Sequence, residues 1–60
     1  MFKVEINTNN AAFGEDRFEK QAELKRLLEK IIAELDLGFV DKAPIMDSNG
    51  NKVGYWELEE

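Results

Sequence analysis

One amphipathic segment, from Asp16 to Leu37, constrains the fold of this chain more than any other. Its large apolar side chains recur three or four residues apart, which is the period of a helix and not of a strand. The centre of this stripe is Leu24, Leu28, Ile31 and Leu35, and Leu27 and Ile32 widen it. The other face is charged and is expected to be solvated: Lys20, Glu23, Lys25, Arg26, Glu29, Lys30 and Glu34. The pattern predicts one long helix whose apolar stripe needs a cover.

Capping signals mark both ends of this helix. Asp16 can accept a hydrogen bond from the backbone N–H of Glu19, and the Glu19 carboxylate can reach back to the N–H of Asp16. Gly38 can adopt the left-handed conformation that ends a helix. Phe39 follows and is placed to pack back on the last turn.

Three segments around the helix have the pattern of strands. Residues 2–6 alternate apolar and polar side chains, which indicates a half-buried strand. Residues 43–46 and 52–58 flank Asn49-Gly50, a strong hairpin signal because both central residues of a type I′ turn need positive φ. The predicted order of elements is therefore β-α-β-β.

A two-residue turn would place Met46 opposite Val53, Ile45 opposite Gly54, Pro44 opposite Tyr55, Ala43 opposite Trp56 and Lys42 opposite Glu57. Ala43, Ile45, Trp56 and Leu58 then face the helix, and Pro44, Met46, Val53 and Tyr55 face away. Proline has no N–H to donate, so its strand is expected at an edge. We predict an α+β fold with one helix on a three-stranded antiparallel sheet, strand order 1-3-2, and a single domain spanning residues 1–60.

The residue types argue against an enzyme, a metal centre or a bound cofactor. The chain has no histidine and no cysteine, and Ser48 lies in the expected turn without a plausible base. The stretch 47–51 resembles the start of a calcium loop, but such a loop needs glycine at position six and glutamate at twelve. Lys52 and Leu58 occupy those positions. We expect an ordinary hairpin turn and predict no catalytic, cofactor or metal site.

The net charge of −5 argues against direct binding to nucleic acid, which requires a basic surface. No apolar run approaches eighteen residues, so no membrane span is expected. Absent cysteine and an absent signal-peptide pattern together indicate the cytoplasm. At sixty residues the core is small, and self-association is a reasonable expectation.

Two groups of residues are candidates for binding a partner. The first comprises Pro44, Met46, Val53 and Tyr55 on the sheet face away from the helix, with Tyr55 as the anchor. The second is an acidic rim in which Glu57 and Glu59 join Glu5, Asp41 and Glu60. For each group the alternative is an ordinary surface that keeps the protein in solution.

The opening Phe2-Lys3-Val4-Glu5-Ile6-Asn7-Thr8-Asn9-Asn10-Ala11-Ala12-Phe13 resembles small phage and prophage accessory proteins. These begin with a strand and a Thr-Asp/Asn-Asn-Ala-Ala-Phe stretch, continue in a charged helix, and often end in a turn similar to residues 47–54. Asn9 stands where an acidic residue is more usual. The resemblance implies a protein that binds and blocks a host protein, such as restriction or CRISPR machinery, and it implies no functional residues. The alternative is a structural or assembly protein whose main activity is homodimerisation.

Overall fold

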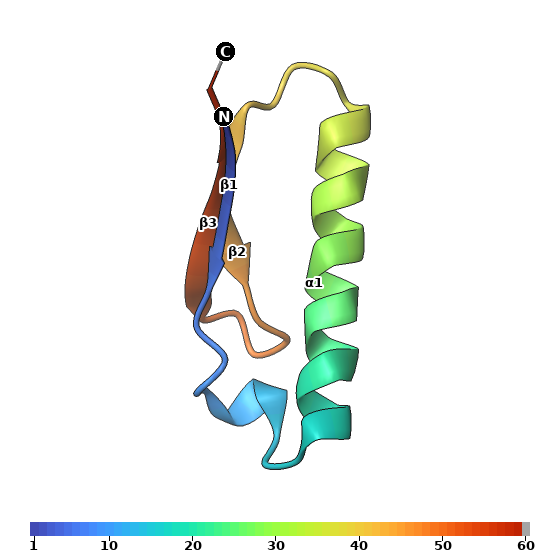
Figure 1. Cartoon of the computed structure of the whole chain (residues 1–60), viewed down its shortest axis with the longest axis vertical. Helices are drawn as coiled ribbons and strands as arrows, with labels where there is room; N and C mark the ends of the chain where they lie inside the picture. The colour runs from blue at the N-terminus through green and yellow to red at the C-terminus, as the bar shows by residue number, and fades with distance from the viewer. Residues whose placement is uncertain (60) are drawn as a thin grey trace.

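The computed structural model describes residues 1–59 and arranges them in two layers (Figure 1). The three strands form one antiparallel sheet, and the long helix covers one of its faces. The predicted α+β fold is confirmed, and a short 3-10 helix appears in the expected loop. In chain order the elements are β1 (Phe2–Ile6), η1 (Ala11–Phe13), α1 (Arg17–Asp36), β2 (Lys42–Met46) and β3 (Lys52–Leu58).

Helix α1 lies between the capping residues that the sequence predicted. Oδ1 of Asp16 accepts a 2.8 Å hydrogen bond from the backbone N–H of Glu19, satisfying one of the free donors at the helix start. The Glu19 carboxylate reaches one residue further back than expected and accepts from the N–H of Glu15 at 3.0 Å. Gly38 has a φ of 78°, the left-handed conformation that ends the helix. No helix in the described part of the chain is long and apolar enough to cross a membrane.

Strand β3 lies in the middle of the sheet, in the order β1-β3-β2 that Pro44 predicted. The first strand pairs with it from Phe2 opposite Leu58 to Ile6 opposite Gly54. On the other side four predicted pairs are present: Lys42–Glu57, Ala43–Trp56, Pro44–Tyr55 and Ile45–Gly54. The predicted register is therefore confirmed over most of the hairpin.

The hairpin turn is not the expected type I′ turn. Gly50 has a φ of 82°, but Asn49 does not share this positive φ. The N–H of Gly50 donates to the carbonyl of Asp47 at 3.0 Å, and the N–H of Asp47 donates to the carbonyl of Asn51 at 2.9 Å. This is the pattern of a three-residue loop, a type I turn followed by a left-handed glycine.

The longer loop shifts the pairing at the end of the hairpin. Met46 lies opposite Lys52 and not opposite Val53, and the predicted register is regained where Ile45 meets Gly54. Val53 is the extra residue of a β-bulge, which turns its side chain toward the helix. Its side chain is only 8% exposed and belongs to the core. The prediction that Val53 lies on the open face is therefore wrong.

Gly54 allows β1 to lie against β3 beside this bulge. A Cβ atom on Gly54 would lie 1.7 Å from the backbone oxygen of Glu5 and 2.7 Å from its carbonyl carbon. Because both contacts are with backbone, no side-chain movement could relieve them. A glycine is required here by the close approach of a neighbouring strand.

The core is centred on Trp56, which α1 covers. Its indole N–H donates to the carboxylate of Glu34 at 2.7 Å, so the polar atom of the buried ring is satisfied. Phe13 of η1 is also fully buried. The complete buried cluster is Phe13, Leu27, Ile31, Ile45, Val53 and Trp56, with Val4, Ile6, Leu24, Val40 and Ala43 packed around it.

The buried line of α1 is rotated from the centre of the predicted stripe. Leu27 is 1% exposed, whereas Leu28 is 45% and Ile32 59% exposed. Leu35 is also exposed, and so is Phe39, which does not pack back on the last turn. The sheet has only three strands in the described part of the chain and covers less than the full width of the apolar stripe. Leu28, Ile32 and Leu35 are left on one flank of the helix, which we call the apolar flank.

Candidate protein-binding site

Tyr55 occupies the centre of the sheet face that α1 does not cover. It lies on β3 between Glu5 of β1 and Pro44 of β2. The side chain is half-buried among these neighbours. It lines a shallow depression of about 400 Å³, which we call the Tyr55 depression, together with Lys42, Ala43, Pro44, Lys52, Trp56 and Glu57. The Tyr55 depression therefore offers an aromatic ring for contact with a partner, with charged side chains around it.

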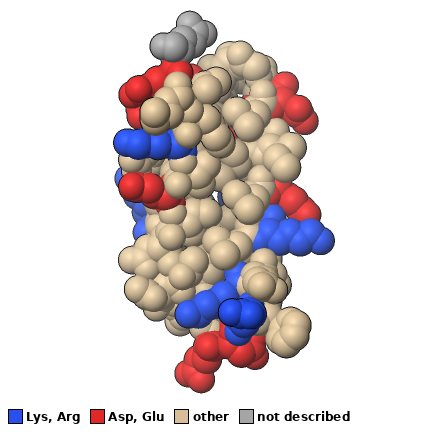
Figure 2. Space-filling view, in the orientation of Figure 1, with Lys and Arg blue, Asp and Glu red and all other residues tan. Residues whose placement is uncertain are grey.

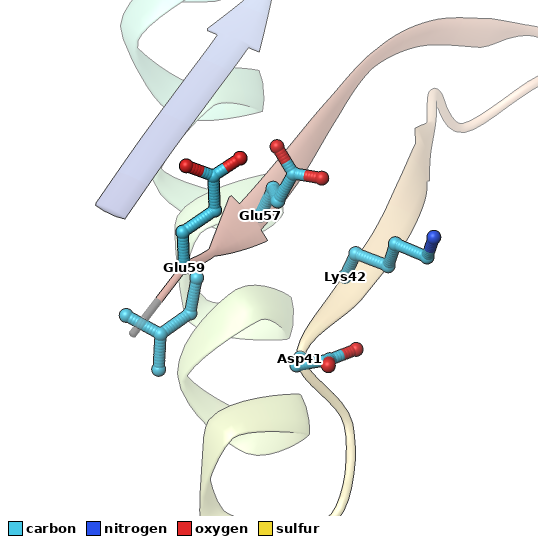
Figure 3. A pocket seen from close by; sticks show the side chains of 5 residues that line it. Asp41, Lys42, Glu57 and Glu59 are labelled. Atoms are coloured by element: carbon cyan, nitrogen blue, oxygen red, sulfur yellow. The ribbon is translucent and has the colours of Figure 1, made fainter. Parts of the chain in front are cut away.

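Three residues of the acidic rim, Asp41, Glu57 and Glu59, line a second depression at the end of the sheet (Figure 3). Its volume is about 490 Å³, and its lining is Asp41, Lys42, Glu57, Leu58 and Glu59. Figure 3 shows the side chains of Glu57 and Glu59 coming from β3 and its end, with Asp41 and Lys42 on the neighbouring strand side. Three carboxylates and one ammonium group therefore surround this depression, which we call the acidic depression.

The two depressions adjoin because Lys42 and Glu57 line both. The sequence predicted two separate contact surfaces, the sheet face around Tyr55 and the acidic rim. In the fold, parts of the two are contiguous, and we call them together the combined surface. Tyr55, Pro44, Glu57 and Glu59 lie along this combined surface. Glu60 lies outside the described residues.

Two of the predicted contact residues do not lie on the combined surface. Val53 is in the core, for the reason given above. Met46 lies at the outer edge of β2 and lines a small depression with Lys30 and Glu34 of α1. The irregular pairing at the end of the hairpin separates it from Tyr55.

A polar cluster that the sequence did not indicate holds the hairpin turn against the rest of the fold. Oδ1 of Asp47 accepts from the backbone N–H groups of Asn49 and Asn51, at 2.9 and 2.8 Å. Its other oxygen accepts from the side-chain amide of Asn10, just before η1, at 2.5 Å. Asp47 is buried, and these donors hold the pKa of its carboxyl below the ordinary value, the N–H of Asn51 contributing most.

Glu23 extends this cluster to the helix. Its carboxylate accepts from Arg26 Nε at 2.7 Å and from the backbone N–H of Ser48 at 3.1 Å. The Arg26 guanidinium is the main cause of the lowered pKa of Glu23. Glu23 was predicted to lie on the solvated face of the helix, and this prediction is wrong because its side chain is buried. Glu23 lies four residues before Leu27 and eight before Ile31, so helical spacing places it on the same buried face, and this spacing could have predicted its burial.

This polar cluster is suited to holding structure and not to proton transfer. Ser48 lies beside Glu23, but a carboxylate whose pKa is lowered is a weak base. Across residues 1–59 no group of three or more acidic side chains is arranged to hold a metal ion. What the combined surface offers is an aromatic ring and mixed charges for contact with another molecule.

No protein-family model, curated protein or solved structure matches this chain.

Proposed function

We propose that this protein acts by binding another protein through the combined surface of the Tyr55 and acidic depressions. The observation that carries the proposal is the placement of a half-buried aromatic ring beside three carboxylates on one accessible surface. Tyrosine is enriched at binding hot spots because its ring buries a large area and has few torsions to immobilise. In this role the protein is not an enzyme and needs no cofactor.

The resemblance to phage accessory proteins suggests the setting for this binding. In that setting the partner is a host protein in the host cytoplasm, of the restriction, CRISPR or other nucleic-acid-processing kind. The partner surface would carry an apolar pocket for Tyr55, with basic side chains facing Asp41, Glu57 and Glu59. A protein that handles DNA or RNA has such a basic surface, and the carboxylates would occupy it in place of phosphates.

The alternative proposal is a structural or assembly protein whose main activity is homodimerisation. The apolar flank of α1 supports this second possibility, because three large apolar side chains on one side of a helix need a cover. The two proposals use different surfaces. They can therefore be tested with different variants.

The test of host-protein binding is capture from host lysate with the tagged protein and a Tyr55→Thr variant. Threonine is compatible with a strand, so the sheet is preserved while the ring is removed. We expect the wild-type protein to retain a stoichiometric host protein, and the variant to lose at least about tenfold in affinity for it. A captured protein that binds the variant equally well would contradict the role of Tyr55.

A matched control is Phe18→Ala, which also removes one aromatic ring. Phe18 is 82% exposed and lies in the first turn of α1, outside the combined surface. We expect this variant to capture the partner as the wild type does. A Glu57→Lys/Glu59→Lys variant tests the acidic depression, and its binding should weaken most at low salt, where charge attraction is strongest.

A further inference from the structure

Strand β1 has a free edge, because within residues 1–59 its only neighbour in the sheet is β3. The backbone hydrogen bonds show which residues have groups on that edge. Met1 and Glu59 exchange hydrogen bonds, and the N–H of Asn7 donates to the carbonyl of Val53 at 2.8 Å. In an antiparallel pair such residues alternate with residues whose backbone groups point outward. Phe2, Val4 and Ile6 therefore present their N–H and C=O groups on the free edge.

We propose that this edge binds the same edge of a second copy of the chain, giving a twofold-symmetric dimer with a continuous six-stranded sheet. The proposal rests on homodimerisation, the alternative function proposed above, and specifies how the two copies meet. It does not use the combined surface of the Tyr55 and acidic depressions. An antiparallel pairing of two identical strands is self-complementary, as a twofold dimer requires. Hydrogen bonds between Phe2, Val4 and Ile6 of the two copies satisfy groups that otherwise have only solvent.

The charges on β1 favour one register of this pairing. With the twofold axis at Val4, Phe2 lies opposite Ile6 of the second copy, and Lys3 lies opposite its Glu5. Lys3 and Glu5 are then in non-hydrogen-bonded positions, where opposing side chains are closest. Opposite charges stabilise such pairs, and like charges destabilise them.

The neighbouring registers are unfavourable. An axis at Lys3 would place two lysines opposite each other, and an axis at Glu5 would place two glutamates opposite each other. A shift by a single residue would turn the apolar side of one strand toward the polar side of the other. Only the axis at Val4 combines opposite charges on one face with Phe2, Val4 and Ile6 on the other.

The apolar flank of α1 lies on the same side of the molecule as β1. On α1, Lys30 and Glu34 lie toward β2, because they line a depression with Pro44, Ile45 and Met46. Successive residues advance about 100° around a helix, so Leu28, Ile32 and Leu35 lie on the other side of the line through Leu27 and Ile31. Figure 2 shows this β1-facing view of the molecule as largely uncharged across its middle, with charged side chains toward the margins.

The dimer would cover this flank. The twofold axis is perpendicular to the joined sheet, so the two α1 helices lie on the same face and run antiparallel. Leu28, Ile32 and Leu35 of one copy then face the same residues of the other. Phe2 is also exposed, and its ring lies tilted against that of Trp56 with 6.0 Å between the ring centroids. The second copy would cover it where the two β1 strands meet. The Tyr55 depression lies on the opposite face of the sheet and stays accessible in both copies.

The test is a charge exchange followed by sedimentation. Lys3→Glu and Glu5→Lys each place like charges opposite one another in the homodimer. We expect the wild type to sediment as a dimer and each variant alone to have a dissociation constant raised about tenfold or more. In an equimolar mixture of the two variants, both glutamates of one chain lie opposite both lysines of the other. We expect this mixture to form a 1:1 heterodimer with restored affinity.

Circular dichroism and thermal melting establish that each variant is folded. Glu5→Lys is the cleaner variant, because Glu5 lies opposite Tyr55 within the chain, whereas Lys3 lies opposite Glu57. Tyr55→Thr is the matched control and should leave the dimer unchanged even where it abolishes host-protein capture. A wild type that sediments as a monomer up to millimolar concentration would overturn the proposal. Dimers that persist in both charge variants, or a mixture that fails to associate, would also overturn it.

Discussion

The two edges of the sheet differ in what they offer to another strand. The backbone N–H of Leu58 donates to the carbonyl of Asp41 at 2.7 Å. By alternation, the backbone groups of Lys42, Pro44 and Met46 on β2 therefore face outward. Proline has no N–H, and it therefore interrupts the row of donors at the centre of this edge. On β1 the outward-facing Phe2, Val4 and Ile6 all retain their donors. The β2 edge is therefore protected against the addition of another strand, and the β1 edge is not.

The same difference continues in the helix layer. On the β2 side, Glu34 accepts from Trp56, and charged side chains border the core. On the β1 side, the apolar flank is exposed beside the free strand edge. The unprotected edge of β1 and the exposed apolar flank of α1 therefore lie on the same side of the molecule. This combination makes the β1 side suited to binding a second copy, whereas the β2 side is suited only to contact with solvent.

The largest expected effect is the difference in stability lost when a core residue and a residue of the apolar flank are each replaced by alanine. Leu27→Ala removes a fully buried side chain and should lower the free energy of unfolding by about 2–5 kcal/mol, enough to unfold so small a domain. Leu28→Ala, one position along and 45% exposed, should lower it by less than about 1 kcal/mol at concentrations where the chain is monomeric. Urea titrations of both variants measure the difference. Equal losses would show that the flank belongs to the core.

Acid should weaken the polar cluster on the hairpin side. The pKa values of Glu23 and Asp47 are lowered in the folded state, from ordinary values of 4.5 and 3.8. Their stabilisation is therefore complete above about pH 4.5 and is lost as the pH falls through the lowered folded-state values. Thermal melts from pH 7 to pH 2 should show a shallower decline for Glu23→Gln than for wild type. Glu29→Gln, an exposed change on the same helix, should follow the wild type.

The sequence predicted the helix, its caps, the strand order and most of the register because each has a local cause. Asp16 and Gly38 define α1, and Pro44 places β2 at an edge. The bulge at Val53 depends on the type of turn formed by Asp47 to Asn51, which Asn49-Gly50 alone does not determine. The burial of Glu23 depends on where the hairpin turn lies against α1. Both features depend on contacts between distant segments, which leave no periodic pattern in the sequence.

The predicted strand order 1-3-2 already placed β1 at an edge of the sheet, but it did not show which of its backbone groups point outward. Phe2, Val4 and Ile6 read as a half-buried strand whichever neighbour the strand has. Only the alternation of hydrogen bonds with β3 shows which backbone groups point outward. The Tyr55 depression was anticipated in part, because the faces of Pro44 and Tyr55 follow from simple alternation along the strands.

A smaller effect should follow from restoring the missing donor on β2. Pro44→Val gives this edge a continuous row of outward-facing groups and a residue that favours strands. We expect little change in the stability of the monomer, within about 1 kcal/mol, but a new concentration-dependent association beyond the dimer. Light scattering compares this variant with Met46→Val, which changes an apolar residue on the same strand without adding a donor. Identical behaviour of the two variants would show that Pro44 does not protect this edge.

Amide hydrogen exchange at Val4 tests the difference between the two edges most directly. In a monomer the N–H of Val4 faces solvent, and in the proposed dimer it donates to the second copy. We expect its protection to rise with protein concentration and to disappear in Glu5→Lys, while the outward-facing N–H of Lys42 on β2 exchanges rapidly throughout. An unprotected Val4 N–H at every concentration, or equal protection of Lys42, would contradict an open β1 edge that is occupied by a second copy.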